Sequence, residues 1–170
     1  MTLILKNLQT AVKLNMQHIG KDTNMIRKLM GIYRVDVSVL FVSDDYMSKL
    51  NESFRNTQGP TDLFIFPTLE IGEPGSLPLL NEEMDNLGLG DVFLGPAHIQ
   101  RQCESNGDNF HTVVMATITH GFHHLIGYDH ETERQQQLMV KTEGSILENF
   151  NKLTGHQCNP LLRQITKTEM

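Results

Sequence analysis

The stretch from residue 120 to residue 130, HGFHHLIGYDH, most constrains this chain, because it holds four of the eight histidines. His120 and His124 are four residues apart, so on a helix their side chains lie one turn apart on the same face. Gly127 suits the left-handed turn that ends many helices, and His130 follows close enough to fold back. Three imidazoles converging from a helix and its exit loop leave a fourth tetrahedral position open, as in catalytic zinc sites. The spacing therefore predicts one zinc ion held by His120, His124 and His130.

The other histidines are weaker candidates for ligands. His123 lies three residues after His120, so it could replace His124 as the second ligand. The spacing that predicts the site, however, is the one that relates Gly127 and His130 to His120 and His124. We therefore keep His124 as the ligand. Four histidines have no partner at ligand spacing, and we predict them to be structural or solvated: His18, His98, His111 and His156.

The length and composition indicate one intracellular domain. The chain has 170 residues, 39% of them hydrophobic, which is enough for one well-formed core. No apolar run approaches the ~20 residues that span a bilayer, and the first residues are too quickly polar for a secretory signal. Cys103 and Cys158 lie far apart and outside the histidine stretch, which favours two reduced thiols in an intracellular protein.

The net charge of −6 argues against strong sequence-independent binding to nucleic acid, because proteins that contact many phosphates are usually basic. The charge is uneven, since the segment 1–34 carries six basic residues and one acidic residue. A basic segment of this kind fits contact with a polyanion, an ordinary solvated face or mitochondrial import. We expect an intracellular location, mitochondrial or cytoplasmic, and leave these alternatives open.

Short strands and helices are mixed along the chain. Alternating or β-branched patterns predict strands at 3–8, 35–42, 62–66 and 90–95. Helical spacing, capping residues and Pro96 predict helices at 24–29, 43–56, 96–103, 111–126 and 131–149. The segment 68–88 is a long acidic loop by composition. The order predicts a layered α+β or α/β domain over residues 1–155, followed by a loosely ordered tail over residues 156–170.

The helix predicted at 111–126 has an unusual composition. Its run of β-branched residues is unfavourable for a helix by propensity alone. Burial would have to override that preference, so we expect this helix to lie under the sheet.

A zinc site with an open position predicts hydrolysis. The spacing of the three histidines and the glycine is shared with metzincin peptidases, which carry a glutamate as general base directly after the first histidine. Here Gly121 stands at that position. General acid–base catalysis contributes roughly 10²–10⁴ in rate, and Asp129 and Glu131, although adjacent, need not face the water. A degenerate metzincin-like peptidase is therefore the second hypothesis.

The motif His120-Gly121-x-x-His124-Leu125-x-Gly127-Tyr128-Asp129-His130 resembles the signature of the YbeY family of single-domain zinc-dependent endoribonucleases. Three other stretches match in the same order: Leu50-Asn51-x-x-x-Arg55, Pro60-Thr61-Asp62-Leu63-Phe64-Ile65-Phe66-Pro67 and Leu89-Gly90-Asp91-Val92. With the histidine motif, the resemblance covers most of the chain from Val35 to about Phe150. The resemblance implies a four-stranded sheet with surrounding helices, zinc on the three histidines, and cleavage of single-stranded RNA. It also implies a role in ribosomal RNA maturation and quality control, notably at the small-subunit 3′ end, and in eukaryotes a link to mitochondrial ribosomes.

With this resemblance we predict an α+β single domain with a small four-stranded mixed sheet, helices packed on it, and the metal-binding histidines on a helix and its exit loop. Arg55 is the predicted catalytic residue beyond the ligands, because a guanidinium can stabilise charge on a phosphodiester. Asp62 and Asp91 could each orient a ligand imidazole or merely cap a strand, and both interpretations stay open. Ile65 departs from the family, which has a serine there.

We predict single-stranded RNA as the substrate, which the resemblance implies is ribosomal RNA, and we expect no membrane or DNA partner. An acidic nuclease needs help to find RNA, so we also expect a ribosomal or other protein partner that targets it. A third hypothesis is a non-catalytic ribosome-assembly factor that uses zinc only to hold its fold.

Overall fold

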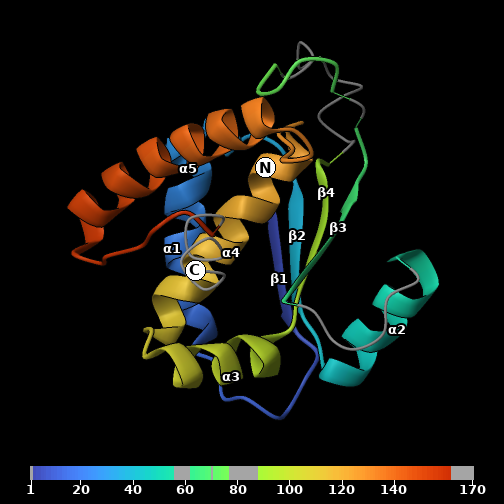
Figure 1. The fold of residues 1–170 in the computed structure, drawn as a ribbon. Helices are drawn as coiled ribbons and strands as arrows, with labels where there is room; N and C mark the ends of the chain where they lie inside the picture. The colour runs from blue at the N-terminus through green and yellow to red at the C-terminus, as the bar shows by residue number, and fades with distance from the viewer. Residues whose placement is uncertain (1, 56–61, 70, 77–87, 162–170) are drawn as a thin grey trace.

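The computed structural model describes residues 2–55, 62–69, 71–76 and 88–161, and Figure 1 shows their arrangement. A four-stranded sheet stands upright, with helices on both faces. The elements in chain order are β1 (Leu3–Asn7), α1 (Met16–Leu29), β2 (Val37–Phe41), α2 (Asp44–Arg55), β3 (Leu63–Pro67), β4 (Gly90–Leu94), α3 (Pro96–Asn106), α4 (Phe110–Leu125) and α5 (Glu133–Thr154). The predicted α+β fold with a small four-stranded sheet is confirmed.

The sheet is mixed, with the strand order β1-β2-β4-β3. β1 pairs with β2 and β2 pairs with β4 in parallel, whereas β3 runs antiparallel to β4. Along β4 the residues alternate between buried and half-buried, because successive side chains of a strand point to opposite faces. The two faces of the sheet therefore have different neighbours.

One face of the sheet carries the main core, and the other carries α2. Helix α4 contacts β3 and β4 as well as α1, α3 and α5, so it is the central helix of the main layer. The smaller apolar cluster on the opposite face consists of buried Val42, Met47 and Phe64 with half-buried neighbours. Figure 1 shows α2 alone on that side.

Helix α4 is buried from residue 113 to residue 123, as the β-branched sequence required. Its threonine hydroxyls are not left unpaired in this apolar layer. Thr117 donates to the Val113 carbonyl and Thr119 to the Met115 carbonyl, each at 2.7 Å, which satisfies their polar groups within the helix. Packing under the sheet thus overrides the low helix propensity.

Side-chain caps set where α1, α4 and α5 begin. The Asn109 side chain accepts from the Thr112 backbone N–H at the start of α4. Thr132 and Gln135 form a reciprocal capping box at the start of α5, which satisfies two backbone donors that the helix leaves open. Helix α1 begins at Met16 rather than at the predicted Asn24, because Asn15 caps it through the His18 N–H.

The segment after α5 differs from the loosely ordered tail that we predicted. The Asn151 side chain bonds both the backbone N–H and the backbone carbonyl of Cys158, at 2.9 and 3.0 Å, and Cys158 and Leu161 are buried. These contacts hold the chain against the domain as far as residue 161. Residues 162–170 lie outside the described part. Within the part of the chain that the structure describes, no helix is long and apolar enough to cross a membrane.

Candidate metal centre

The last turns of α4 and the loop after it bring three predicted ligands together. His120 and His124 lie on one face of α4, near its carboxyl end. The helix ends at Leu125, and Gly127 follows it with a φ of 101°, which is open to glycine but not to most residues. The Tyr128 N–H donates back to the His123 carbonyl. This turn reverses the chain and returns His130 to the two helical histidines.

One donor nitrogen from each of His120, His124 and His130 lies within 4.8 Å of the other two. The Nε2 atoms of His120 and His124 are 3.1 Å apart, and their rings stand nearly perpendicular, at 88°. Two nitrogens at this distance cannot both carry a proton comfortably, whereas two ligands of one tetrahedral zinc lie roughly 3.3 Å apart. The donor set therefore fits a transition-metal ion.

The surroundings of His120 and His124 favour the neutral form of imidazole, which is the form that binds metal ions. Burial, with His130 as a neighbour, lowers the pKa of His120 to about 4. Burial also lowers the pKa of His124 to about 4, with further contributions from His120 and His130. A neutral imidazole is the form that binds metal ions. Because both rings are already neutral at pH 7, metal binding does not have to displace a proton from an imidazolium.

Glu143 on α5 orients the His120 ring by contacting Nδ1, the ring nitrogen that points away from the histidine cluster. Its Oε1 lies 2.7 Å from Nδ1 of His120, and both side chains are buried. Burial raises the pKa of Glu143 to about 7. A cation at Nε2 of His120 would favour the carboxylate form, because Nδ1–H then donates to it, as in many carboxylate–histidine–metal arrangements.

Glu143 is not among the residues predicted from the sequence, although a signal is present in it. Glu143 is four residues from Met139 and four from Leu147, and all three are buried. An acidic residue on the apolar stripe of a helix is unusual, because a buried carboxylate requires a partner. Its partner is His120, 23 positions earlier in the chain.

His123 does not belong to the cluster. It is buried, its Nδ1 bonds the Thr119 carbonyl at 2.8 Å, and its ring packs edge-on against Tyr128 at 5.4 Å. The cluster contains His124 in its place. The choice of His124 over His123 from the spacing agrees with this placement.

Gly121 lies on the side of α4 that faces the sheet. A Cβ atom there would lie 3.0 Å from Val92 Cγ1 and 3.3 Å from Leu63 Cδ1. The missing side chain lets α4 approach β3 and β4 closely, which holds the histidines at a fixed depth. A glutamate at this position would meet Val92 and Leu63 in the core, so the metzincin arrangement does not fit this packing.

The remaining predicted residues fall in different places. Asp62 precedes β3 and lies near enough to His120 for its charge to oppose, in part, the lowering of the His120 pKa by burial. Asp91 alternates with Val92 along β4, and Val92 faces α4, so Asp91 points to the opposite face and cannot orient a ligand imidazole. Ile65 packs against the main core.

The side chain of Arg55, the last residue of α2, lies outside the described residues, so its role stays a prediction.

A segment from the acidic loop lies over the exit of α4. The Gly75 N–H donates to the Ile126 carbonyl at 2.9 Å. A Cβ at Gly127 would lie 3.0 Å from Ile71 Cγ2, so the turn glycine also makes room for this segment. The loop thereby fixes the turn that carries His130 back.

Comparison with known proteins places the chain among endoribonucleases. A family model described as Endoribonuclease YbeY matches residues 3–151. The human protein named Endoribonuclease YbeY is 31% identical over 163 residues, which are 96% of this chain and 96% of the human one. A protein of the same name from Halalkalibacterium halodurans is 36% identical over 141 residues, covering 76% of this chain and 87% of that one.

One solved structure also resembles the chain. A solution structure of a Thermotoga maritima protein covers 94% of this chain and 99% of its own, with a TM-score of 0.50 and 21% identity. At this identity the likeness concerns the fold alone.

Proposed function

Because the chain belongs to the YbeY family of endoribonucleases, we propose that it is a zinc-dependent hydrolase that cleaves single-stranded RNA at the site formed by His120, His124 and His130. The observation that carries the proposal is the convergence of three histidine donors within 4.8 Å. Three protein ligands leave a coordination position for the reaction, as catalytic zinc sites do. The metzincin and assembly-factor hypotheses have no comparable support.

The chain's own residues supply the binding and orientation. The three imidazoles would hold the ion, and Glu143 keeps the His120 ring in the orientation that directs Nε2 into the cluster. A zinc ion held there would supply Lewis-acid chemistry and positive charge toward a phosphodiester. Gly121 keeps α4 close against β4, so the ligands keep their positions relative to the sheet.

Arg55 would supply positive charge toward the scissile phosphate. A guanidinium presents paired donors that match the geometry of phosphate oxygens. Support for this role comes from the matching Leu50-Asn51-x-x-x-Arg55 stretch and from its place at the end of α2. We keep it as the proposed catalytic residue.

The proposed substrate is ribosomal RNA, and a ribosomal or other protein partner would deliver it. The net charge of −6 supports the need for a partner, since electrostatic attraction to RNA is weak for an acidic protein. We propose an intracellular location, mitochondrial or cytoplasmic.

The test compares RNA and protein substrates. Purified protein is incubated with single-stranded RNA, double-stranded RNA and casein, each with and without a chelator. We expect cleavage of single-stranded RNA alone, its loss in chelator, and its return with added zinc. His124→Gln should abolish cleavage, and Arg55→Ala should lower it by roughly 10²–10³, as loss of a charge-stabilising donor does.

His98→Gln is the matched control, because His98 lies on α3 and bonds only Gln102 among the described contacts. It should cleave like the wild type. Cleavage of casein without cleavage of RNA would refute the proposal in favour of a peptidase. A folded, zinc-loaded protein that cleaves neither substrate would favour a structural role for the metal.

A further inference from the structure

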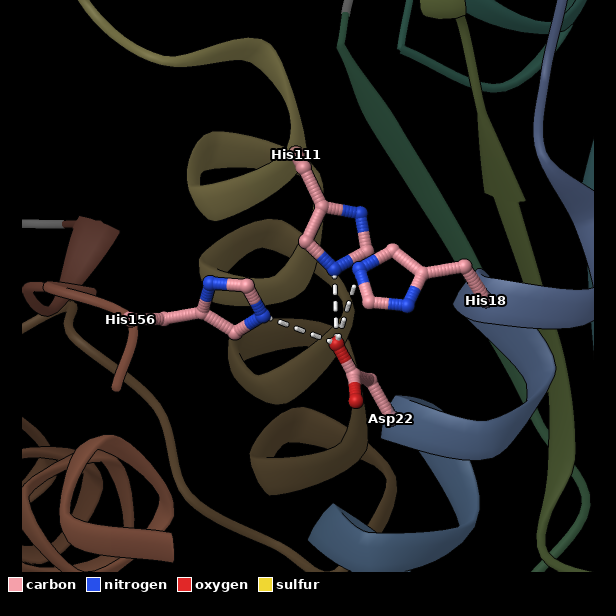
Figure 2. Close-up of side chains that lie close together, drawn as sticks. All are labelled: His18, Asp22, His111 and His156. Carbon is pink, nitrogen blue, oxygen red and sulfur yellow. Dashed lines mark hydrogen bonds and ion pairs between the residues drawn. The ribbon is translucent and has the colours of Figure 1, made fainter. Parts of the chain in front are cut away.

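A second group of potential ligands lies at the opposite end of α4 from the candidate metal centre. Figure 2 shows three imidazoles directed toward one carboxylate. They come from α1, from the first turn of α4 and from the segment after α5. The group, which we call the Asp22 cluster, consists of His18, Asp22, His111 and His156.

The donor atoms of the Asp22 cluster meet at one point. The Oδ2 atom of Asp22 lies 2.7 Å from Nε2 of His111, 3.2 Å from Nε2 of His156 and 3.6 Å from Nε2 of His18. All four donor atoms lie within 4.8 Å of one another. Ligands of a tetrahedral zinc at bond lengths of about 2.0–2.1 Å lie roughly 3.3 Å apart, and the three distances fall on either side of that value.

The chemistry of the cluster also fits a metal ion. Three imidazoles crowd one another, with the rings of His18 and His111 stacked at 4.1 Å, so charging all of them would bring like charges together. Burial lowers the pKa of His111, the hydrogen bond and the charge of Asp22 oppose this change, and the two neighbouring imidazoles add to it. His111 therefore favours the neutral form, which is the form of imidazole that binds metal ions.

We propose that the Asp22 cluster is a second metal site, which takes a divalent transition ion of the zinc class. Three nitrogen donors and one oxygen suit zinc and its neighbours, whereas magnesium and calcium prefer oxygen donors alone. Four protein ligands make the site closed, which is typical of a structural metal, in contrast to the three ligands of the candidate metal centre.

The position of the Asp22 cluster suggests what the ion does. His111 is separated from Asp22 by 89 positions, and His156 from Asp22 by 134. An ion bound there would join α1, α4 and the segment after α5. A metal that joins segments far apart in the sequence closes long loops, and such a metal stabilises a folded protein most. His111 and His120 are nine residues apart on α4, so the two sites lie about 13 Å apart along the helix.

The experiment measures the zinc content of tag-free full-length protein. Metal-stripped protein is dialysed against zinc, or against magnesium as the negative control, and the bound metal is measured by elemental analysis. The variants are His156→Gln and His18→Gln, whose side chains are 26% and 43% exposed and tolerate replacement best. His98→Gln is the matched control, and His124→Gln reports on the other site.

We expect each cluster variant to hold one zinc ion fewer per chain than the wild type and the His98→Gln control. Zinc should raise the Tm of the wild type and the control more than that of the variants, while the cluster variants still cleave RNA. Cobalt-loaded His124→Gln should show the visible bands of tetrahedral cobalt, and these should disappear in the double variant with His156→Gln.

Equal zinc contents in the wild type and both cluster variants would overturn the proposal and leave a hydrogen-bond network around Asp22. The comparison uses the difference between variants, so it stays valid if the candidate metal centre binds no ion. Circular dichroism and the Tm of metal-stripped samples check folding. If His156→Gln does not fold, His18→Gln on the more exposed ring gives the same comparison.

Discussion

The Nδ1 atom of His120 lies 2.7 Å from Oε1 of Glu143, and this contact joins α4 to α5 inside the protein. Glu143 is fully buried, and its second oxygen, Oε2, has no hydrogen-bond partner among the described residues. A buried carboxylate with one unpaired oxygen is costly unless a positive charge lies nearby. A cation bound at Nε2, on the other side of the His120 ring, would supply such a positive charge and offset this cost.

Replacing Glu143 tests this relationship. We expect Glu143→Ala to weaken zinc binding at the candidate metal centre about 10–100-fold, because the His120 ring loses the group that orients it. Competition with a chromophoric chelator measures the affinity. Glu148→Gln, an exposed position on the same helix, is the control and should change nothing. Unchanged affinity in Glu143→Ala would mean that the contact is only structural.

Replacing Gly121 tests the close approach of α4 to the sheet. Alanine is usually better than glycine in a helix by about 1 kcal/mol. Here its Cβ would lie 3.0 Å from Val92 in the core, and overpacking costs about 1–3 kcal/mol. We expect Gly121→Ala to lower the free energy of unfolding by about 1 kcal/mol, measured by urea denaturation.

Gly144 on α5 offers the matched control for Gly121. A Cβ there would meet only Pro160 Cγ, at an ordinary 3.8 Å. Gly144→Ala should therefore stabilise the protein by about 0.5–1 kcal/mol. If Gly121→Ala also raised the free energy of unfolding, the close packing at Gly121 would not contribute to stability.

The buried Arg27 holds the turn between α1 and β2. One of its terminal nitrogens, Nη2, donates to the carbonyls of Tyr33 and Val35, each at 3.0 Å. Arg27→Ala would leave both acceptors without their donor in a largely buried region, at about 1–3 kcal/mol each. We expect a loss of about 2–4 kcal/mol in urea denaturation. Lys28→Ala, an exposed neighbour, should cost under about 1 kcal/mol, and an equal loss in both would contradict this account.

The two thiols should react slowly in the folded protein. Burial raises the pKa of Cys103 to about 11 and that of Cys158 to about 12. At pH 8, three units below the first value, only about one Cys103 in a thousand is thiolate, and thiolate is the reactive form. Alkylation by iodoacetamide at pH 8 should be far slower in native than in urea-unfolded protein. Comparable rates would show that the thiols are accessible.

Much of the fold could be predicted from local patterns. The four strands were placed to within two residues of their ends, because β-branched runs bounded by turns are a strong signal. Helix α1 was predicted eight residues too short, since its first turns carry few apolar residues and its cap at Asn15 was missed. The segment through residue 161 was expected to be loose, because its contacts with Asn151, seven residues before Cys158, and with Asp22, 134 residues before His156, leave no local pattern in the sequence.

The candidate metal centre was predicted because its histidines lie within eleven residues, where helix geometry and one glycine turn fix their relation. Only the tertiary structure brought Glu143 to His120, and only it assembled the Asp22 cluster from three separate segments. It also showed that Gly121 faces Val92 while Asp91 faces away. Sequence spacing reports on neighbours within one or two turns. Contacts between distant segments depend on how the helices pack on the sheet, and that packing is decided by the whole core together.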